Sequence, residues 1–407
     1  MTLGSASLDA ESLLGSELGQ SGPEALPGAA VTARKTKVLL LLHELSRTGA
    51  PRIALDALVA MRDEVEVRTI APVGGPLAED CRAIGPLSII SQWLPGNVWQ
   101  RAYGRFERGR WFRGLRRWAP DLIYINSVAA LSITQWVPLP DVPTILHVHE
   151  LHTEIMQVMK RCPDAMVSRP ARYLAASEAV LRALVCECGI NEDRIAVVHE
   201  FVPERRIYGV SNDGVRRPDD DTLVIGGAGM PHWRKGTTLW LQMAAEVRRL
   251  VGPSARFVWV GVPEWPDHAW YEGAKFRREA HLMGLDDIIE LIPPTPKALE
   301  HFVGFNIFAM TSWEDPCPLV VLENMGLAKP VVCFAGGGGA PEVVGDTGVI
   351  IPDFDPQAMA RAIADLAADP QQRARLGALA RQRVLANFTD RVQVPKIRRE
   401  IRLLVNR

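Results

Sequence analysis

Two short runs of apolar, β-prone residues flank a helix-like stretch in the last third of the chain, and they limit the fold strongly. The runs are Ile307 to Met310 and Val331 to Phe334. Continuous apolar runs of this length are typical of parallel strands that are covered on both faces. The residues between them read as an acidic loop and a helix, and a glycine-rich turn follows the second run. This region therefore predicts a strand, a helix and a second strand of a parallel α/β sheet.

The same alternation of strand and helix extends over most of the sequence. It begins at Lys37, breaks at the polar stretch Tyr208 to Asp221, and restarts at Thr222. Strands that are separated by helices imply a doubly wound parallel sheet. A chain of 407 residues also exceeds the size at which one core stays single. We therefore expect two Rossmann-like domains that face a deep cleft, with ligands at the carboxyl ends of the strands.

Charge and cysteine content exclude several classes of protein. Lys and Arg total 46 against 47 Asp and Glu, so the chain has no overall basic character and nucleic acid is not an expected partner. The six cysteines contain no CxxC pair, which favours a reduced, cytosolic compartment. Apolar runs such as Val38 to Leu42 are too short to cross a bilayer.

The first 34 residues are rich in Gly, Ser, Ala, Glu and Pro. They lack the basic start and apolar block of a signal peptide. Such a composition buries too little apolar surface to offset the entropy of ordering, so we expect a disordered extension.

The acidic loop and its helix suggest a ligand. Asp315 precedes the helix and Glu323 lies eight positions later, inside its first turns. Pro318 suits the first helical position, which leaves the amides of Leu319 and Val320 as free donors at a positive helix end. Two carboxylates beside an anion site fit a ligand with both hydroxyls and a diphosphate. A nucleotide sugar is such a ligand.

The stretch from Ser312 to Ala340 resembles the acidic motif of the retaining glycosyltransferases of family four, which have the GT-B fold. The family pattern has Glu, seven residues, Glu, a small-residue helix, a Pro-Val-Val strand and a Gly-Gly turn. Asp315 stands where the first Glu is expected, with Glu314 just before it, while Glu323 and Pro330 to Val332 match directly. So do Gly336 to Gly339, of which Gly337 and Gly338 are predicted to approach the sugar and phosphate. The alternative is an ordinary connection in which the acids cap the helix.

A second motif, Lys235-Gly236, follows the first strand of the second half. It resembles the family's Lys-Gly, whose lysine contacts the donor diphosphate. The family usually has an arginine five residues earlier, where this chain has Met230. Arg234 is the natural substitute, because a guanidinium can contact two phosphate oxygens at once. The alternative is a solvated basic pair in a loop.

The first half offers two weaker candidates. The loop from Ser46 to Arg52 resembles the family's first-strand loop, and Gly49 would let backbone approach the donor. The strand Thr144 to His149 ends in HVHELH, and the resemblance places His149 near the transferred sugar, where it is predicted to touch a hydroxyl. A plain tight turn and a structural histidine are the alternatives. His147 and His149 share one face of the strand, which leaves a metal site as a less favoured reading.

The segment Trp99 to Trp118 interleaves seven arginines with six aromatics. This composition suits an anionic membrane surface, and many relatives act on lipid-linked acceptors. The alternative is a helix whose aromatics pack on the sheet while its arginines face water. Three glycines weaken the prediction of a helix.

The resemblance implies an enzyme that moves a sugar, with retention, from a nucleotide donor to an acceptor hydroxyl. It further implies envelope polysaccharide, lipopolysaccharide or lipid-linked glycan synthesis, a cytoplasmic location with peripheral membrane contact, and no metal or other cofactor. The predicted catalytic residues are His149, Asp315 and Glu314, and the predicted donor-binding residues are Gly49, Arg234, Lys235, Leu319, Val320, Glu323, Gly337 and Gly338. An epimerase on the same scaffold and a non-catalytic nucleotide-sugar-binding protein are the alternatives.

The resemblance also assigns roles to the segments of the chain. Residues 1–34 are the extension and 35–207 the acceptor-side domain. Residues 208–221 form the linker, and 222–388 the donor domain. Residues 389–407 are predicted to form a helix that crosses back onto the first domain.

Overall fold

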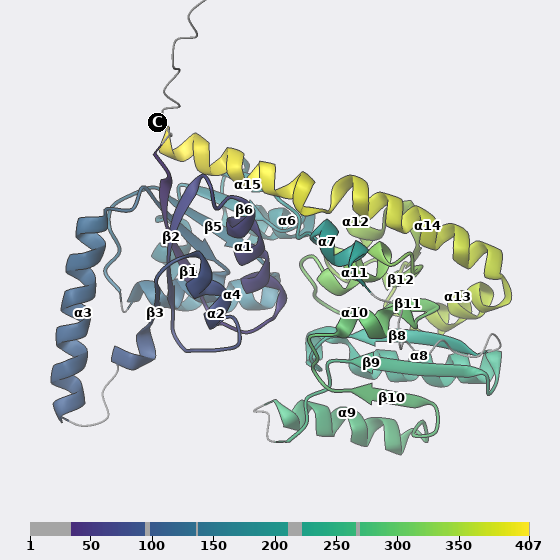
Figure 1. Ribbon diagram of the computed structural model, residues 1–407. Coiled ribbons are helices and arrows are strands. Elements are labelled where there is room, and N and C mark those ends of the chain that lie inside the picture. The colour runs from purple at the N-terminus through teal and green to yellow at the C-terminus, as the bar shows by residue number, and fades with distance from the viewer. Residues whose placement is uncertain (1–33, 94–97, 136, 211–221, 266–268, 407) are drawn as a thin grey trace, which may run out of the picture. The chain divides into compact units, whose positions relative to one another are not determined.

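The computed structural model describes residues 34–93, 98–135, 137–210, 222–265 and 269–406 (Figure 1). Side chains between positions 92 and 107 are also outside the description. The predicted extension 1–34, except its last residue, and most of the predicted linker 208–221 therefore lie outside the described residues.

The first half contains a seven-stranded parallel sheet with the order β3-β2-β1-β4-β5-β6-β7. Its strands are β1 Thr36–Leu42, β2 Val65–Ala71, β3 Leu87–Ile89, β4 Leu122–Asn126, β5 Thr144–Val148, β6 Arg172–Ala175 and β7 Ile195–Val197. The side chains of β1 are buried along most of its length, as expected for a central strand that helices cover on both faces. The strand order reverses between β1 and β4, which is where ligands bind in sheets of this kind.

The second half repeats this arrangement in a six-stranded parallel sheet with the order β10-β9-β8-β11-β12-β13. Its strands are β8 Leu223–Ala228, β9 Ala255–Val260, β10 Ile289–Ile292, β11 Ile307–Met310, β12 Val331–Phe334 and β13 Val349–Ile351. The two apolar runs Ile307–Met310 and Val331–Phe334 are β11 and β12, at the predicted bounds. The predicted fold class of two Rossmann-like parallel sheets is confirmed.

Helices connect the strands within each half. In the first half they are α1 Gly49–Ala60, α2 Ala78–Ile84, α3 Val98–Trp118, α4 His152–Arg161, α5 Pro163–Val167, α6 Glu178–Cys188 and α7 Glu204–Tyr208. In the second half they are α8 Thr237–Val251, α9 Trp270–Leu282, α10 Ala298–Val303, α11 Leu319–Gly326, α12 Ala340–Val344, α13 Pro356–Ala368 and α14 Pro370–Asn387. The last helix, α15 Asp390–Val405, follows α14 directly.

Helix α15 belongs to the core of the first sheet, although it ends the chain (Figure 1). Val394, Ile397 and Ile401 are buried in the same apolar cluster as residues of β1 and α1. The carboxylate of Glu400 accepts a hydrogen bond from Nε of Arg172 on β6 at 2.6 Å. Burial of this apolar stripe stabilises α15 on the first sheet, at about 25 cal/mol for each Å² of apolar surface.

The arginine-rich segment forms the helix α3 despite its glycines. Among its described side chains, Leu115 and Trp118 are buried, and the indole N–H of Trp118 donates to Glu66 at 2.5 Å. Trp111 and Phe112 pack against the same core. The described aromatics thus point inward, while Arg108, Arg110, Arg113, Arg116 and Arg117 are exposed. Within the described residues, no helix is long and apolar enough to span a membrane.

Candidate functional site

Three loops of the second half lie side by side because the strands that precede them are neighbours. Strands β8, β11 and β12 are adjacent in the sheet and run in the same direction. The loops after them carry Lys235-Gly236, the segment Ser312 to Asp315, and the turn Gly336 to Gly339. The two sequence motifs of the second half therefore meet at the carboxyl edge of one sheet, where a Rossmann-like fold places its ligand.

Lys235 and Asp315 form an ion pair at the centre of this edge. The Nζ atom of Lys235 lies 2.6 Å from Oδ2 of Asp315, and the Asp315 side chain is only 8% exposed. Gly236 makes the approach possible, since its φ of 62° favours glycine and a Cβ there would lie 2.1 Å from the Thr311 carbonyl. The hydroxyl of Thr311 donates to the Lys235 carbonyl at 3.1 Å, which fixes the turn to the end of β11.

The acidic loop and the glycine turn are joined by a short backbone ladder. The amide of Asp315 donates to the Gly337 carbonyl at 3.1 Å, and the amide of Gly339 donates to the Asp315 carbonyl at 2.8 Å. Gly338 has a φ of 92°, and a Cβ there would lie 2.7 Å from Cδ1 of Leu151 in the first half. In this conformation the turn therefore lets Leu151, the residue before α4, approach closely, in addition to any approach to a sugar.

The N-termini of two helices meet at the same place. Helix α11 begins at Leu319, with Pro318 as its N-cap rather than its first residue, one position from the prediction. A Cβ on Gly49, the first residue of α1, would lie 3.4 Å from Cδ1 of Leu319. Neither helix has a side chain that accepts a hydrogen bond at its N-cap. The amides of Leu319 and Val320 lack helical partners because of their position, so two positive helix ends converge here.

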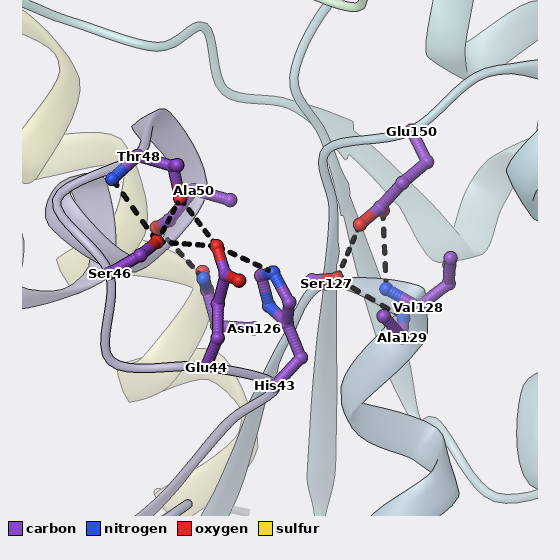
Figure 2. A network of polar contacts seen from close by, with 10 residues as sticks. All are labelled: His43, Glu44, Ser46, Thr48, Ala50, Asn126, Ser127, Val128, Ala129 and Glu150. Carbon is purple, nitrogen blue, oxygen red and sulfur yellow. Dashed lines mark hydrogen bonds and ion pairs between the residues drawn. The ribbon is translucent and has the colours of Figure 1, made fainter. Parts of the chain in front are cut away.

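The loop before α1 is organised by Glu44, as Figure 2 shows. Its carboxylate accepts hydrogen bonds from the hydroxyls of Ser46 and Thr48 and lies 3.6 Å from Nε2 of His43. The interaction with His43, which outweighs burial, lowers the pKa of Glu44 to about 2. This charged anchor fixes the loop that carries Gly49.

His149, the predicted sugar contact, is buried with both ring nitrogens engaged. Its Nδ1 lies 3.1 Å from Oε1 of Glu200, and its Nε2 lies 3.0 Å from Oδ1 of Asn126. Burial lowers the pKa of His149 to about 4, against the opposing charge of Glu150. His149 thus has no ring nitrogen left for a sugar hydroxyl in this arrangement, and its predicted contact stays a prediction.

Glu200 is a buried carboxyl that the sequence analysis did not single out. It lies just after β7, and its side chain is 7% exposed. Burial raises the pKa of Glu200 well above its ordinary value, the charge of Asp315 raises it further, and Lys235 opposes both. Glu200 therefore contacts the first-half histidine and is influenced by both charges of the second-half ion pair.

Two further acids near the site hold helices. Glu150 accepts hydrogen bonds from the Ser127 hydroxyl and from the Val128 amide, the latter at 3.2 Å (Figure 2). Glu314, a predicted catalytic residue, accepts from the hydroxyl of Thr153 at 2.8 Å and from its amide at 3.4 Å. Thr153 is in the first turn of α4, so Glu314 binds a positive helix end of the first half.

Glu323 is paired with a cation of the first half. Its Oε1 lies 3.0 Å from Nη2 of Arg206, on the short helix α7. Burial raises the pKa of Glu323, whereas Arg206 and then Arg52 lower it. Glu323 lies four residues after Leu319, which is about one helical turn from the start of α11.

Arg234 is half-buried, and its Nε is buried without a hydrogen-bond partner in the described part of the chain. Burying a guanidinium nitrogen without a partner costs free energy unless an anion accepts a hydrogen bond from it. Met230, which stands where the resemblance expects arginine, is 46% exposed.

Other features of the structure do not add to the site. No group of three or more His, Cys, Asp or Glu side chains within the described ranges has the geometry to hold a metal ion. A cavity of about 570 Å³ lies along α1, lined by residues that include Arg47, Arg52, Asp56, Asp80 and Arg205. None of the predicted site residues lines this cavity, and its charges are mixed, so we assign it no ligand.

Three contributors escaped the sequence analysis, namely Glu200, Asn126 and Arg206. Asn126 and Glu200 are polar residues at or just after the ends of apolar strands, which is a usable signal in a parallel sheet. Arg206 carries no comparable signal, because its partner Glu323 is remote in sequence.

Comparison with known proteins shows which family this chain resembles in sequence. Residues 221–369 match the model of "Glycosyl transferases group 1", and residues 48–206 match that of "Glycosyltransferase Family 4". The D-inositol 3-phosphate glycosyltransferase of Streptomyces scabiei is 26% identical over 369 residues, which cover 79% of this chain and 78% of that protein. The protein of the same name from Streptomyces coelicolor is 26% identical, with coverage of 89% and 90%.

A solved structure shows the same architecture. The crystal structure of Anabaena HepE (Alr3699) in complex with UDP and glucose matches with a TM-score of 0.72 and 18% sequence identity. The match covers 91% of this chain and 100% of that one. The two family matches together cover every strand of both sheets except β1. The chain therefore belongs to the group 1 glycosyltransferases of family four, and its two parallel sheets form the GT-B fold.

Proposed function

We propose that this glycosyltransferase takes its sugar from a nucleoside diphosphate sugar and transfers it with retention to an acceptor hydroxyl. The observation that carries the proposal is the ion pair between Lys235 and Asp315, which lies in the loop that leads into α11, the helix whose N-terminus meets that of α1. A cation next to two positive helix ends suits a diphosphate, and the adjacent carboxylate suits sugar hydroxyls. That HepE was crystallised with UDP and glucose supports a donor of this class.

Each part of the nucleotide-sugar donor has a candidate partner in the protein. Lys235 and Arg234 contact the diphosphate, Arg234 through the nitrogen that is buried without a partner in the described chain. The amides of Leu319 and Val320 donate two further hydrogen bonds to the diphosphate. Glu323, which is paired with Arg206, accepts a hydrogen bond from the ribose. Asp315 holds donor hydroxyls. These groups would lower the barrier by stabilising negative charge that develops on the leaving phosphate.

The transfer exchanges one bond for another at the anomeric carbon. The acceptor oxygen forms a bond to this carbon on the face from which the phosphate oxygen departs, and the acceptor proton passes to that phosphate. The products are the glycoside and the nucleoside diphosphate. No metal is required in this scheme, since Lys235, Arg234 and the helix amides carry the neutralising charge.

A binding experiment tests the donor class first. UDP, GDP, ADP and their glucose conjugates would be added to the full chain, and the melting temperature recorded. A ligand at about a hundred times its Kd stabilises the native state by about 2.7 kcal/mol. We expect one base to raise the melting temperature and the others to leave it unchanged. No shift with any of these nucleotides, up to millimolar concentrations, would refute the proposed donor class.

A product assay tests the reaction. The selected donor would be incubated with and without acceptor alcohols, and anomeric configuration would be read by NMR. Retention in the glycoside supports the proposal. An inverted product refutes the retaining mechanism, and conversion of the donor to a sugar epimer without acceptor would identify an epimerase instead.

A further inference from the structure

The buried carboxyl of Glu200 has no place in the functions proposed above, although it touches several of their parts. Its Oε1 lies 3.1 Å from Nδ1 of His149. Its Oε2 would lie 3.4 Å from a Cβ placed on Gly49. Glu200 thus lies between the buried histidine and the point where two helix N-termini converge.

The hydrogen-bond partners of His149 indicate which atoms of His149 and Glu200 carry protons. The Nδ2 group of Asn126 donates to the Ala50 carbonyl at 2.8 Å, which leaves Oδ1 to face Nε2 of His149 at 3.0 Å (Figure 2 shows the contact with Ala50). Because Oδ1 can only accept, Nε2 carries a hydrogen. In a neutral imidazole Nδ1 is then an acceptor, and the proton between Nδ1 and Glu200 must belong to the carboxyl.

The alternative places a cationic imidazole beside a carboxylate in the protein interior. Burying two charges is expensive unless further hydrogen bonds satisfy them. Asp315 adds a second negative charge near Glu200, although Lys235 partly compensates it. Burial works against the charged form of both partners, since it lowers the pKa of His149 and raises that of Glu200. The neutral pair is the state that fits these surroundings.

We propose that Glu200 is a positioning residue that acts as a neutral acid and donates a hydrogen bond to His149. This bond fixes His149 on Asn126, and Asn126 in turn holds the first turn of α1 through the Ala50 carbonyl. The inference rests on the proposed donor site at Gly49 and Leu319. A neutral carboxyl tolerates a phosphate there, whereas a carboxylate would repel it.

The proposal predicts a pH dependence with a definite direction. Donor binding should be full while Glu200 is protonated and should weaken as the pH rises through its raised pKa. The other titratable or charged groups that face Glu200 are His149, Glu150, Cys317, Asp315 and Lys235. His149 also faces His43 and His147. Substitution of Glu200 itself separates its titration from theirs.

Two substitutions distinguish the neutral acid from a carboxylate. In Glu200→Gln the amide can still donate to Nδ1, so we expect a donor KM within about threefold of the wild type near pH 6 and no rise at alkaline pH. Glu200→Leu cannot donate a hydrogen bond to Nδ1 of His149, so the KM for the nucleotide sugar should rise at least about tenfold. If Glu200→Gln were as impaired as Glu200→Leu, or kept the wild-type pH profile, the proposal would be wrong. Glu400→Gln, a buried carboxyl paired with Arg172, is the matched control and should keep the wild-type profile.

A second measurement does not depend on activity. In protein with ¹⁵N-labelled histidine, long-range ¹H–¹⁵N correlation spectra report which ring nitrogen of His149 is protonated, and His149→Asn assigns the signals. We expect a neutral ring with the proton on Nε2 at pH 7, both in the wild type and in Glu200→Gln. A cationic ring, or a proton on Nδ1, would overturn the proposal. Absence of nucleotide-sugar turnover in the wild type would instead refute the proposed function, and the spectra would still decide the state of His149.

Discussion

Two buried carboxyl groups, Asp315 and Glu200, interact electrostatically at the site, and their surroundings differ. Asp315 belongs to the second half and has a cation, Lys235, at 2.6 Å. Glu200 follows the last strand of the first half and has a histidine at 3.1 Å, whose pKa burial lowers to about 4. One carboxyl is therefore matched by a charge, and the other by a hydrogen bond. The proposed donor site can therefore hold two acids near a phosphate, because only one of them needs to be charged.

The largest expected effect comes from removing the cation of the charged pair. Lys235→Ala removes the proposed phosphate contact and leaves Asp315 buried without its partner, so we expect kcat/KM to fall by about 10²- to 10³-fold. The melting temperature should also fall, because an unpaired buried charge is costly. Steady-state kinetics and thermal unfolding measure the two effects. Lys297→Ala, which removes an exposed cation paired with Glu300, serves as the control.

A double variant sharpens this result. In Lys235→Ala with Asp315→Asn the unpaired charge is gone, so part of the lost stability should return while transfer stays low. If Lys235→Ala were as active as the control, the ion pair would be structural and the donor site would lie elsewhere.

The contrast between the two carboxyls also explains what the sequence predicts well. Asp315 and Glu323 lie in one continuous stretch, and the strand bounds Ile307–Met310 and Val331–Phe334 follow directly from their apolar runs. Short-range patterns of this kind can be read from the sequence, because each strand and the loop after it stay close together in the fold. The whole second-half edge was therefore predictable, apart from details such as the N-cap position of Pro318.

Glu200 was not predictable in the same way, because its role depends on three separate strand ends. Its partner His149 follows β5, and Asn126 ends β4. A polar residue after an apolar strand marks a position at the ligand edge, but the pattern does not say which polar residues will touch. The two nitrogens of His149 are satisfied only by these remote partners, and for that reason its predicted sugar contact could not be judged from the sequence.

A second prediction concerns Glu323, which is paired with the first-half Arg206. If Glu323 accepts a ribose hydrogen bond, Glu323→Gln should raise the donor KM about tenfold with little change in kcat, since a hydrogen bond to a charged group contributes about 1.5 kcal/mol or more. Kinetics at varied donor concentration measure this. Glu246→Gln, which alters a carboxylate of α8 that is paired with Arg249, is the control. A fall in kcat with an unchanged KM would contradict the ribose assignment.

Stability should report the neutral state of Glu200 as well. A carboxyl whose pKa is raised on folding binds its proton more tightly in the native state than in the unfolded chain. Its contribution to stability is therefore complete below the unfolded pKa of about 4.3 and is lost as the pH rises through the folded value. Glu200→Gln carries no such loss, so its stability relative to the wild type should improve from pH 4 towards alkaline pH.

Denaturant unfolding of both proteins between pH 4 and pH 9 measures this difference. His149 acts in the opposite direction, because its lowered pKa costs stability as the pH falls from about 6.5 towards 4. The histidine is present in both proteins, so its effect largely cancels in the comparison. A difference that is independent of pH would mean that Glu200 titrates normally and that the two carboxyls are alike.

The smallest expected effect lies outside the site, on α3. Its exposed arginines Arg108, Arg113, Arg116 and Arg117 can attract anionic lipid, but the described aromatics of the helix pack on the first sheet and are not available for insertion. Attraction without insertion contributes at most about 1 kcal/mol per arginine and is weakened by salt. Replacing the four by Gln should therefore reduce co-sedimentation with phosphatidylserine vesicles severalfold at low salt and hardly at all at high salt. The substitutions Arg361→Gln and Arg375→Gln, on helices of the second half, provide the control. Binding that the four substitutions leave unchanged would show that α3 does not contact the membrane, and the first half would then meet its acceptor by other means.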